Sequence, residues 1–140
     1  MKYMSWTCNL ELGIPALDRD HRRLIDLFAR VQQLPGRGAD ACDLVRATVD
    51  DLVHHVTHHF HREQLLMELV GYPDAPRHRR SHEAIAARLG EFQSLLRRNS
   101  VMFPQDRFRD FLTGRLSPHL LVDDMDLKPW VDRLAERRAA

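Results

Sequence analysis

Two pairs of potential metal ligands stand four residues apart in the sequence: His59 with Glu63, and His78 with His82. In an α-helix this offset leaves the two side chains about 40° apart around the axis, so both can reach the same ion. Further His and Asp residues lie towards both ends of the chain, among them His21 and His119. The combination predicts a site for more than one metal ion inside a helical protein.

The ligand candidates fall on helix stripes that normally hold Leu, Ile, Val or Phe. Burying imidazole and carboxylate groups there without partners would cost several kcal/mol each. A cation removes this cost, because each group can donate a lone pair to it. One histidine in an apolar stripe is more often a hydrogen-bonded core residue, but two i,i+4 pairs with two more aligned histidines favour metal binding. The six residues are His21, His59, Glu63, His78, His82 and His119.

The types of ligand restrict the metal. A structural zinc site needs four ligands, commonly cysteines, and Cys8 and Cys42 are too far apart in sequence to form a ligand pair. Calcium prefers oxygen ligands throughout. Imidazoles combined with carboxylates suit first-row ions such as iron, with the carboxylates bridging. A ferritin-like site needs Glu-x-x-His on two helices, and no Glu in this sequence is followed by His three residues later.

Four segments with helical periodicity must position these residues. They cover about 18–34, 40–70, 77–98 and 106–126, separated by Pro- and Gly-containing breaks, with Asp40 a candidate N-cap of the second. Residues 1–17 form an extended leader, and a short C-terminal helix can follow Pro129. Strand alternation is absent. The sequence therefore predicts an all-α fold, an up-down-up-down antiparallel four-helix bundle.

Composition agrees with one soluble domain. The 140 residues are 44% hydrophobic and 29% charged, and the net charge of +1 gives no general attraction to nucleic acid or acidic lipid. The first residues lack the apolar stretch of a signal peptide. No run reaches the roughly 20 apolar residues of a membrane span. We expect a cytoplasmic protein without nucleic-acid or membrane partners.

The ligand candidates belong to a longer pattern over residues 6–126. The pattern reads Trp6-x6-Gly13-Ile14-Pro15-x-Leu17-Asp18-x-x-His21, His59-Phe60-x-x-Glu63-x-x-x-Met67, Tyr72-Pro73, His78-x3-His82 and His119-x4-Asp124. It resembles the hemerythrin family, particularly its bacterial members. The resemblance extends over nearly the whole chain and implies a single hemerythrin-like domain over 1–140.

The resemblance implies a non-haem di-iron centre with an oxo or hydroxo bridge. One iron would be bound by His78, His82 and His119. The other would be bound by His21 and His59 and would keep an open position for O2. Glu63 and Asp124 would bridge the two ions. Leu24, Phe28 and Phe60 are candidates for an apolar pocket wall.

The implied function is reversible binding of molecular oxygen for storage, transport or sensing, without enzymatic activity. Two alternatives stay open: a di-iron enzyme or sensor that acts on peroxide or nitric oxide, and an iron-handling regulatory protein. A monomer is expected, because a single bundle suffices and no sustained heptad seam demands a dimer. The partner protein, if the chain has one, is not indicated.

Three positions depart from the family pattern or from regular helix geometry. Arg115 stands where the family often has Trp, either beside the pocket or pointing to solvent. Gln64 follows Glu63 in place of a second Glu. In a regular helix Asp123, not Asp124, would share the face of His119, whereas Asp124 would be rotated by about 140°. Family spacing favours Asp124, which requires a π-type distortion that Pro118 makes credible.

The remaining histidines cluster on the second segment. His55 stands one turn before His59, which suggests a role beside the ligands or in metal entry. The others are predicted to be surface residues: His54, His58 and His61.

Overall fold

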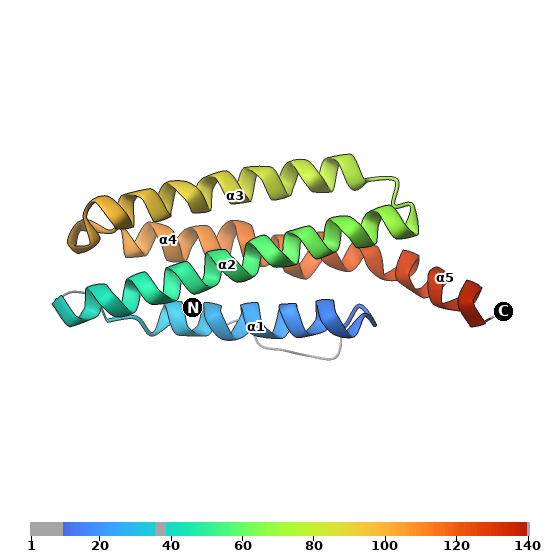
Figure 1. The fold of residues 1–140 in the computed structure, drawn as a ribbon, viewed down its shortest axis with the longest axis horizontal. Coiled ribbons are helices and arrows are strands. Elements are labelled where there is room, and N and C mark those ends of the chain that lie inside the picture. Colours follow the sequence, from blue (N-terminus) through green and yellow to red (C-terminus); the bar gives the residue numbers. More distant parts are fainter. Residues whose placement is uncertain (1–9, 36–38, 140) are drawn as a thin grey trace.

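The computed structural model describes residues 10–35 and 39–139, and within them every regular element is helical. Helices α1 (Pro15–Gln32), α2 (Ala39–Val70) and α3 (Ala75–Arg98) form three antiparallel rods (Figure 1). The fourth rod, residues 105–139, begins with α4 (Gln105–Phe111) and ends with α5 (Lys128–Ala139). The predicted up-down-up-down four-helix bundle is confirmed. Trp6 and the side chain of Asp40 lie outside the described part of the structure.

Two helices begin earlier than their periodicity predicts. The helix expected from residue 18 starts at Pro15, and the one expected from 77 starts at Ala75, followed by Pro76. Proline suits the first turn of a helix, because its fixed φ is helical and its missing N–H would have no partner there. The leader is correspondingly shorter. Asp18 anchors its end by accepting hydrogen bonds from the backbone N–H of Leu12 (2.7 Å) and Gly13 (3.2 Å).

The turn between α2 and α3 has a well-defined geometry. Gly71 adopts φ +67°, a left-handed conformation that glycine accepts without strain. The N–H of Tyr72 donates to the carbonyl of Met67 (3.0 Å), and that of Gly71 donates to Glu68 (3.4 Å). This pair of bonds is a Schellman motif. It sets the direction of α3, on which His78 and His82 lie.

The fourth rod is the least regular element. Two π-helical turns, η3 (Leu112–Leu116) and η4 (His119–Asp123), follow α4, and a 3-10 turn, η5 (Asp124–Leu127), leads directly into α5. The short C-terminal helix expected after Pro129 is present, and it begins at Lys128. Pro129 is the second residue of α5, where it removes no intrahelical hydrogen bond. In Figure 1, α5 extends beyond the ends of α2 and α3.

The interior is divided into two apolar clusters. The larger cluster contains the core residues of α2 from Val45 to Phe60, together with partners from the other rods such as Phe92. The smaller one contains Leu17, Met67 and Leu127, among others. The stretch of α2 between the two clusters carries Glu63. A buried polar layer thus lies between two apolar ones.

None of the described helices is long and apolar enough to cross a membrane.

Candidate metal centre

The structure brings the seven residues expected at the site into one buried layer. Each rod contributes to it: α1 one residue, α2 two, α3 two and the fourth rod two. Their relative exposures are between 0% and 5%. The residues are His21, His59, Glu63, His78, His82, His119 and Asp124.

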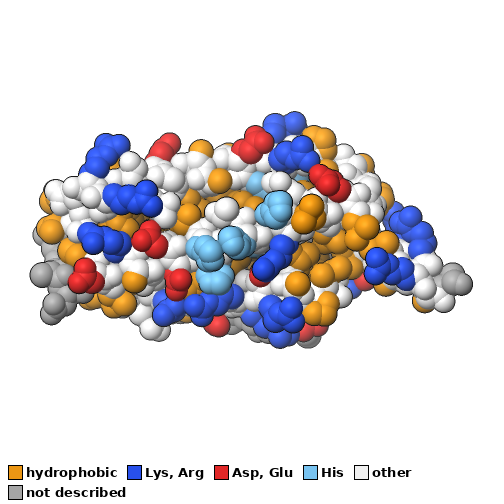
Figure 2. All heavy atoms as spheres, viewed as in Figure 1, with side chains coloured by type: hydrophobic (Ala, Val, Ile, Leu, Met, Phe, Trp, Pro, Cys, Tyr) orange, Lys and Arg blue, Asp and Glu red, His pale blue; other side chains and the backbone are white. Residues whose placement is uncertain are grey.

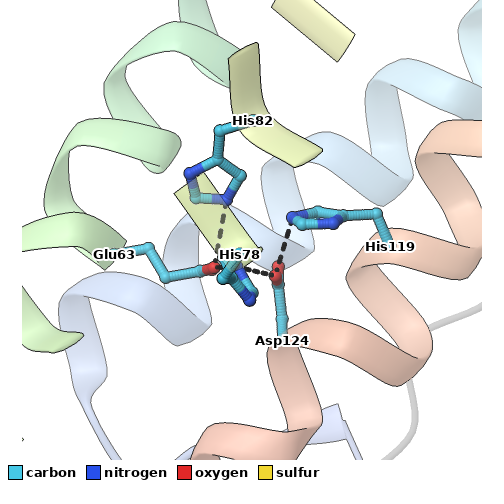
Figure 3. A group of neighbouring side chains, drawn as sticks. All are labelled: Glu63, His78, His82, His119 and Asp124. Atoms are coloured by element: carbon cyan, nitrogen blue, oxygen red, sulfur yellow. Dashed lines mark hydrogen bonds and ion pairs between the residues drawn. The ribbon is translucent and has the colours of Figure 1, made fainter. Parts of the chain in front are cut away.

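Glu63 connects three rings from two helices. Its Oε2 lies 3.0 Å from Nε2 of His59, one turn earlier on α2. Its Oε1 lies 3.2 Å from Nε2 of His82 and forms a short contact with Nε2 of His78. Figure 3 shows the Glu63 carboxylate reaching towards both of these α3 rings. The i,i+4 spacing places both ligands of α2 and both ligands of α3 on the sides of the two helices that face each other.

Asp124 makes the equivalent contacts from the fourth rod. Its Oδ1 lies 3.1 Å from Nε2 of His119 and 3.2 Å from Nε2 of His78. Its Oδ2 lies 3.2 Å from Nε2 of His21 and 3.1 Å from Nε2 of His59. The two oxygens of one carboxylate therefore face two separate groups of imidazoles.

Two overlapping groups of ligand atoms result. In each group the ligand atoms lie within 4.8 Å of one another. Glu63 and Asp124 belong to both groups, so each carboxylate can bridge two ions. The first group is Glu63, His78, His82, His119 and Asp124, and the second is His21, His59, Glu63 and Asp124.

The π-helical turn of η4 explains why Asp124 reaches the site. In a regular helix a residue five positions after His119 points away from it, but an i→i+5 turn brings that residue onto the same face. Asp124 is fully buried, whereas the side chain of Asp123 is 45% exposed. Asp123 contacts His119 from outside, with its Oδ2 3.1 Å from Nδ1. The expected distortion is present, next to Pro118.

Polar groups contact the outer nitrogen of two further ring ligands. Asp20 Oδ2 lies 3.5 Å from Nδ1 of His59, and its other oxygen accepts a short hydrogen bond from Arg62. Gln64 Nε2 lies 3.4 Å from Nδ1 of His82. Such contacts orient a ligating ring and select its tautomer. The sequence did not reveal these two partners, because each acts on a ring from another helix.

The charges of the layer compensate one another. Burial alone would raise the pKa of Asp124, but hydrogen bonds from His119, His21 and His59 hold it well below its ordinary value. Burial alone would lower the pKa of His78, but hydrogen bonds to Asp124 and Glu63 raise it to about 10. The pKa of His59 is also raised well above its usual value: burial opposes the shift, and Asp124, Asp20 and Glu63 outweigh it. The two carboxylates thus favour positive charge at this layer.

The residues present suit a pair of cations. Several buried polar atoms lie close to a partner but lack the geometry of a regular hydrogen bond, including Nε2 of His82, Nε2 of His119, Oε2 of Glu63 and Oδ1 of Asp124. Unpaired buried groups are costly, and a metal ion gives each lone pair a partner. Five imidazoles and two carboxylates form a nitrogen and oxygen donor set that suits iron.

Phe60 is the candidate wall residue in contact with the rings. Its side chain stacks on His82, with centroids 3.9 Å and planes 8° apart, and meets His119 edge-on at 5.5 Å. Leu24 and Phe28 are buried in the larger apolar cluster. His55 is outside both ligand groups, and its ring lies against His54.

Two cavities adjoin the layer, on the sides of different rings. A cavity of about 10 Å³ borders His21 and is otherwise lined by Leu10, Ile25, Leu120 and Leu121. A polar, open cavity of about 400 Å³ borders His78 and His119, and exposed Arg115 forms part of its wall. Arg115 therefore lies at the surface on the side of His78 and His119, not beside His21.

Comparison with known proteins gives consistent matches. Residues 12–131 match the family model described as the hemerythrin HHE cation binding domain. The chain is 31% identical to a bacteriohemerythrin of Stenotrophomonas maltophilia over 124 residues, 89% of this chain and 78% of the relative. It is 24% identical to a bacteriohemerythrin of Pseudomonas aeruginosa with the same coverage. The crystal structure of a hemerythrin with a leucine-to-tyrosine substitution has the same fold, with a TM-score of 0.80 at 20% identity, covering 94% of this chain and 98% of that one.

Proposed function

Because the chain belongs to the hemerythrin family, we propose that it is a non-haem di-iron protein that binds molecular oxygen reversibly in the bacterial cytoplasm. The observation that carries this proposal is the pair of overlapping ligand groups that share Glu63 and Asp124. An iron pair bound there would supply electrons to oxygen on binding and take them back on release. We further propose that residues 1–140 form one domain and act as a monomer.

The residues have distinct parts in the proposed centre. His78, His82 and His119 would hold one ion, and His21 and His59 the other, with Glu63 and Asp124 bridging. The group around His21 and His59 offers one protein donor fewer than the other group. We therefore assign oxygen binding to that side.

The surroundings of His21 suit a diatomic ligand. The adjoining cavity holds about 10 Å³ and is bordered by aliphatic side chains, which leaves no room for an organic substrate. The apolar clusters on both sides of the layer limit the access of bulk water to the group around His21 and His59. Exclusion of water suppresses proton leakage and irreversible oxidation.

Absorption spectroscopy of the iron-loaded protein tests the proposal. The reduced protein should gain a charge-transfer band on aeration and lose it again under vacuum, over repeated cycles. About two irons per chain should be present, and His59→Ala or His82→Ala should lower that number. Normal iron content in both variants would show that the ligand assignment is wrong.

A second candidate function has one observation in its favour. The polar cavity of about 400 Å³ beside His78 and His119 gives charged solutes access to the outer side of that ligand group. Such access fits chemistry on peroxide or nitric oxide, or the handling of iron itself. If a single exposure to oxygen converts the protein permanently to its oxidised form, these roles are supported over reversible binding.

A further inference from the structure

A pair of exposed histidines lies on the outer face of α2. His54 and His58 are both exposed, whereas His59, the next residue, is fully buried. One residue along a helix rotates the side chain by about 100°, so His58 and His59 serve different faces of the same turn. Figure 2 shows histidine side chains gathered on the surface near the middle of the molecule.

The ring spacing of this pair is similar to that of a pair inside the buried layer. The rings of His54 and His58 have centroids 4.2 Å apart, with their planes at 45°. His78 and His82, at the same i,i+4 spacing on α3, have ring centroids 4.5 Å apart. Two imidazoles at this spacing on a helix can bind one metal ion together.

The neighbouring side chains leave both rings available. Among the described residues, neither His54 nor His58 forms a hydrogen bond or an ion pair with the protein. The acids one turn earlier are already engaged: Asp50 accepts a hydrogen bond from Gln93 (3.0 Å), and Asp51 pairs with Arg23 at 3.7 Å. His54 and His58 are the closest pair of imidazole donors on this surface, with ring centroids 4.2 Å apart, compared with 5.4 Å between His54 and His55.

We propose that His54 and His58 form a surface site that chelates one divalent first-row transition ion through two imidazole nitrogens. Imidazole suits copper, nickel, zinc and iron among these ions. Water completes the coordination shell, because the site is open to solvent. The site is separate from the buried layer and does not depend on whether that layer binds iron.

A bulky copper complex tests this site in the intact chain. Cu²⁺ held by nitrilotriacetate keeps positions for imidazole nitrogens but is too large to enter a layer whose residues are at most 5% exposed. Electron spin resonance should count two imidazole nitrogens per copper in the unmodified protein. In His54→Ala and in His58→Ala the count should fall to one, and affinity should fall on the order of 100-fold, because chelation is lost.

His61→Ala is the matched control, because it removes another exposed histidine from the same helix. It should leave both the nitrogen count and the affinity unchanged. Circular dichroism of each variant checks that α2 is intact. The proposal is overturned if His61→Ala weakens binding as much as His54→Ala does, or if the unmodified protein binds the complex through a single imidazole.

Discussion

Asp123 and Asp124 are neighbours in sequence but have different environments. The carboxylate of Asp124 is fully buried and contacts rings from all four rods, while Asp123 contacts the ring of His119 and its side chain is 45% exposed. A carboxylate between two imidazole groups can bridge two ions, and one outside a single ring can only orient it. The two residues should therefore differ in what their loss does.

Replacing Asp123 and Asp124 one at a time distinguishes the orienting role from the bridging role. Asp124→Ala should sharply lower the iron content per chain, because both ligand groups lose a shared donor. Asp123→Ala should retain both irons with an affinity about 10- to 100-fold lower, as is usual when a group that orients a ligating histidine is removed. Metal analysis and competition with a chelator measure both effects. Iron that persists in Asp124→Ala but vanishes in Asp123→Ala would reverse the assignment.

The raised pKa of His78 predicts how pH affects the metal-free protein. The pKa rises from the ordinary 6.5 to about 10, so the folded state binds this proton more tightly than the unfolded state. The resulting stabilisation is complete below pH 6.5 and is lost as the pH rises through about 10. Denaturant unfolding across this range should show stability falling with pH. The fall should be smaller in His78→Gln, and an equal fall in both proteins would contradict the prediction.

At the scale of elements, the π-helical turn η4 determines which side of the fourth rod faces the site. Relative to an α-helix, an i→i+5 turn accommodates one additional residue. Downstream of it, Asp124 and the buried Leu127 point inwards. Val122, which lies within the turn, is 59% exposed, so it adds little to the packing of the core.

Deletion of Val122 tests this role of the turn. The deletion leaves His119 and Asp124 four residues apart, which places both on one face of a regular α-helix. Iron content should therefore be retained. Deletion of the exposed Arg80 within the regular helix α3 is the control, because it rotates His78 by about 100° relative to His82. Equal loss of iron in both deletions would show that the π-helical turn does not set the position of Asp124.

At the scale of the whole molecule, the polar layer joins all four rods between two apolar clusters. The layer replaces packing that aliphatic residues would otherwise supply, so its own interactions must hold the rods together there. A metal that binds only the folded state adds stability in proportion to the logarithm of its concentration over Kd. The proposed iron pair therefore supports the fold as well as the function.

Removal of iron should lower the melting temperature. A ligand at 1,000 times its Kd contributes about 4 kcal/mol, which corresponds to a decrease on the order of 10 °C for a chain of this size. Calorimetry before and after treatment with a chelator measures the change. His82→Ala, which should already lack iron, should melt at the same temperature with and without the chelator. If treatment with the chelator leaves the Tm of the unmodified protein unchanged, the metal does not stabilise the fold and the prediction is wrong.

The sequence determined the fold class and most of the buried face of each helix. Periodicity placed His78, His82, Ile85 and Phe92 on one stripe of α3, and all four are buried. These features follow from the backbone geometry of a helix, which fixes how side chains separated by three or four positions are arranged. Local spacing alone does not fix helix limits, and the starts at Pro15 and Ala75 were missed by two or three residues.

Only the tertiary structure decided the features that depend on contacts between rods. Regular helix geometry pointed to Asp123 and the family pattern favoured Asp124, and the π-helical turn of the folded rod presents Asp124 to the site. Asp20 meets His59, and Gln64 meets His82, across helix interfaces that no spacing within one helix encodes. Side chains that are far apart in the sequence come into contact only when the four rods pack together. Their partners therefore cannot be derived from the spacing within one helix.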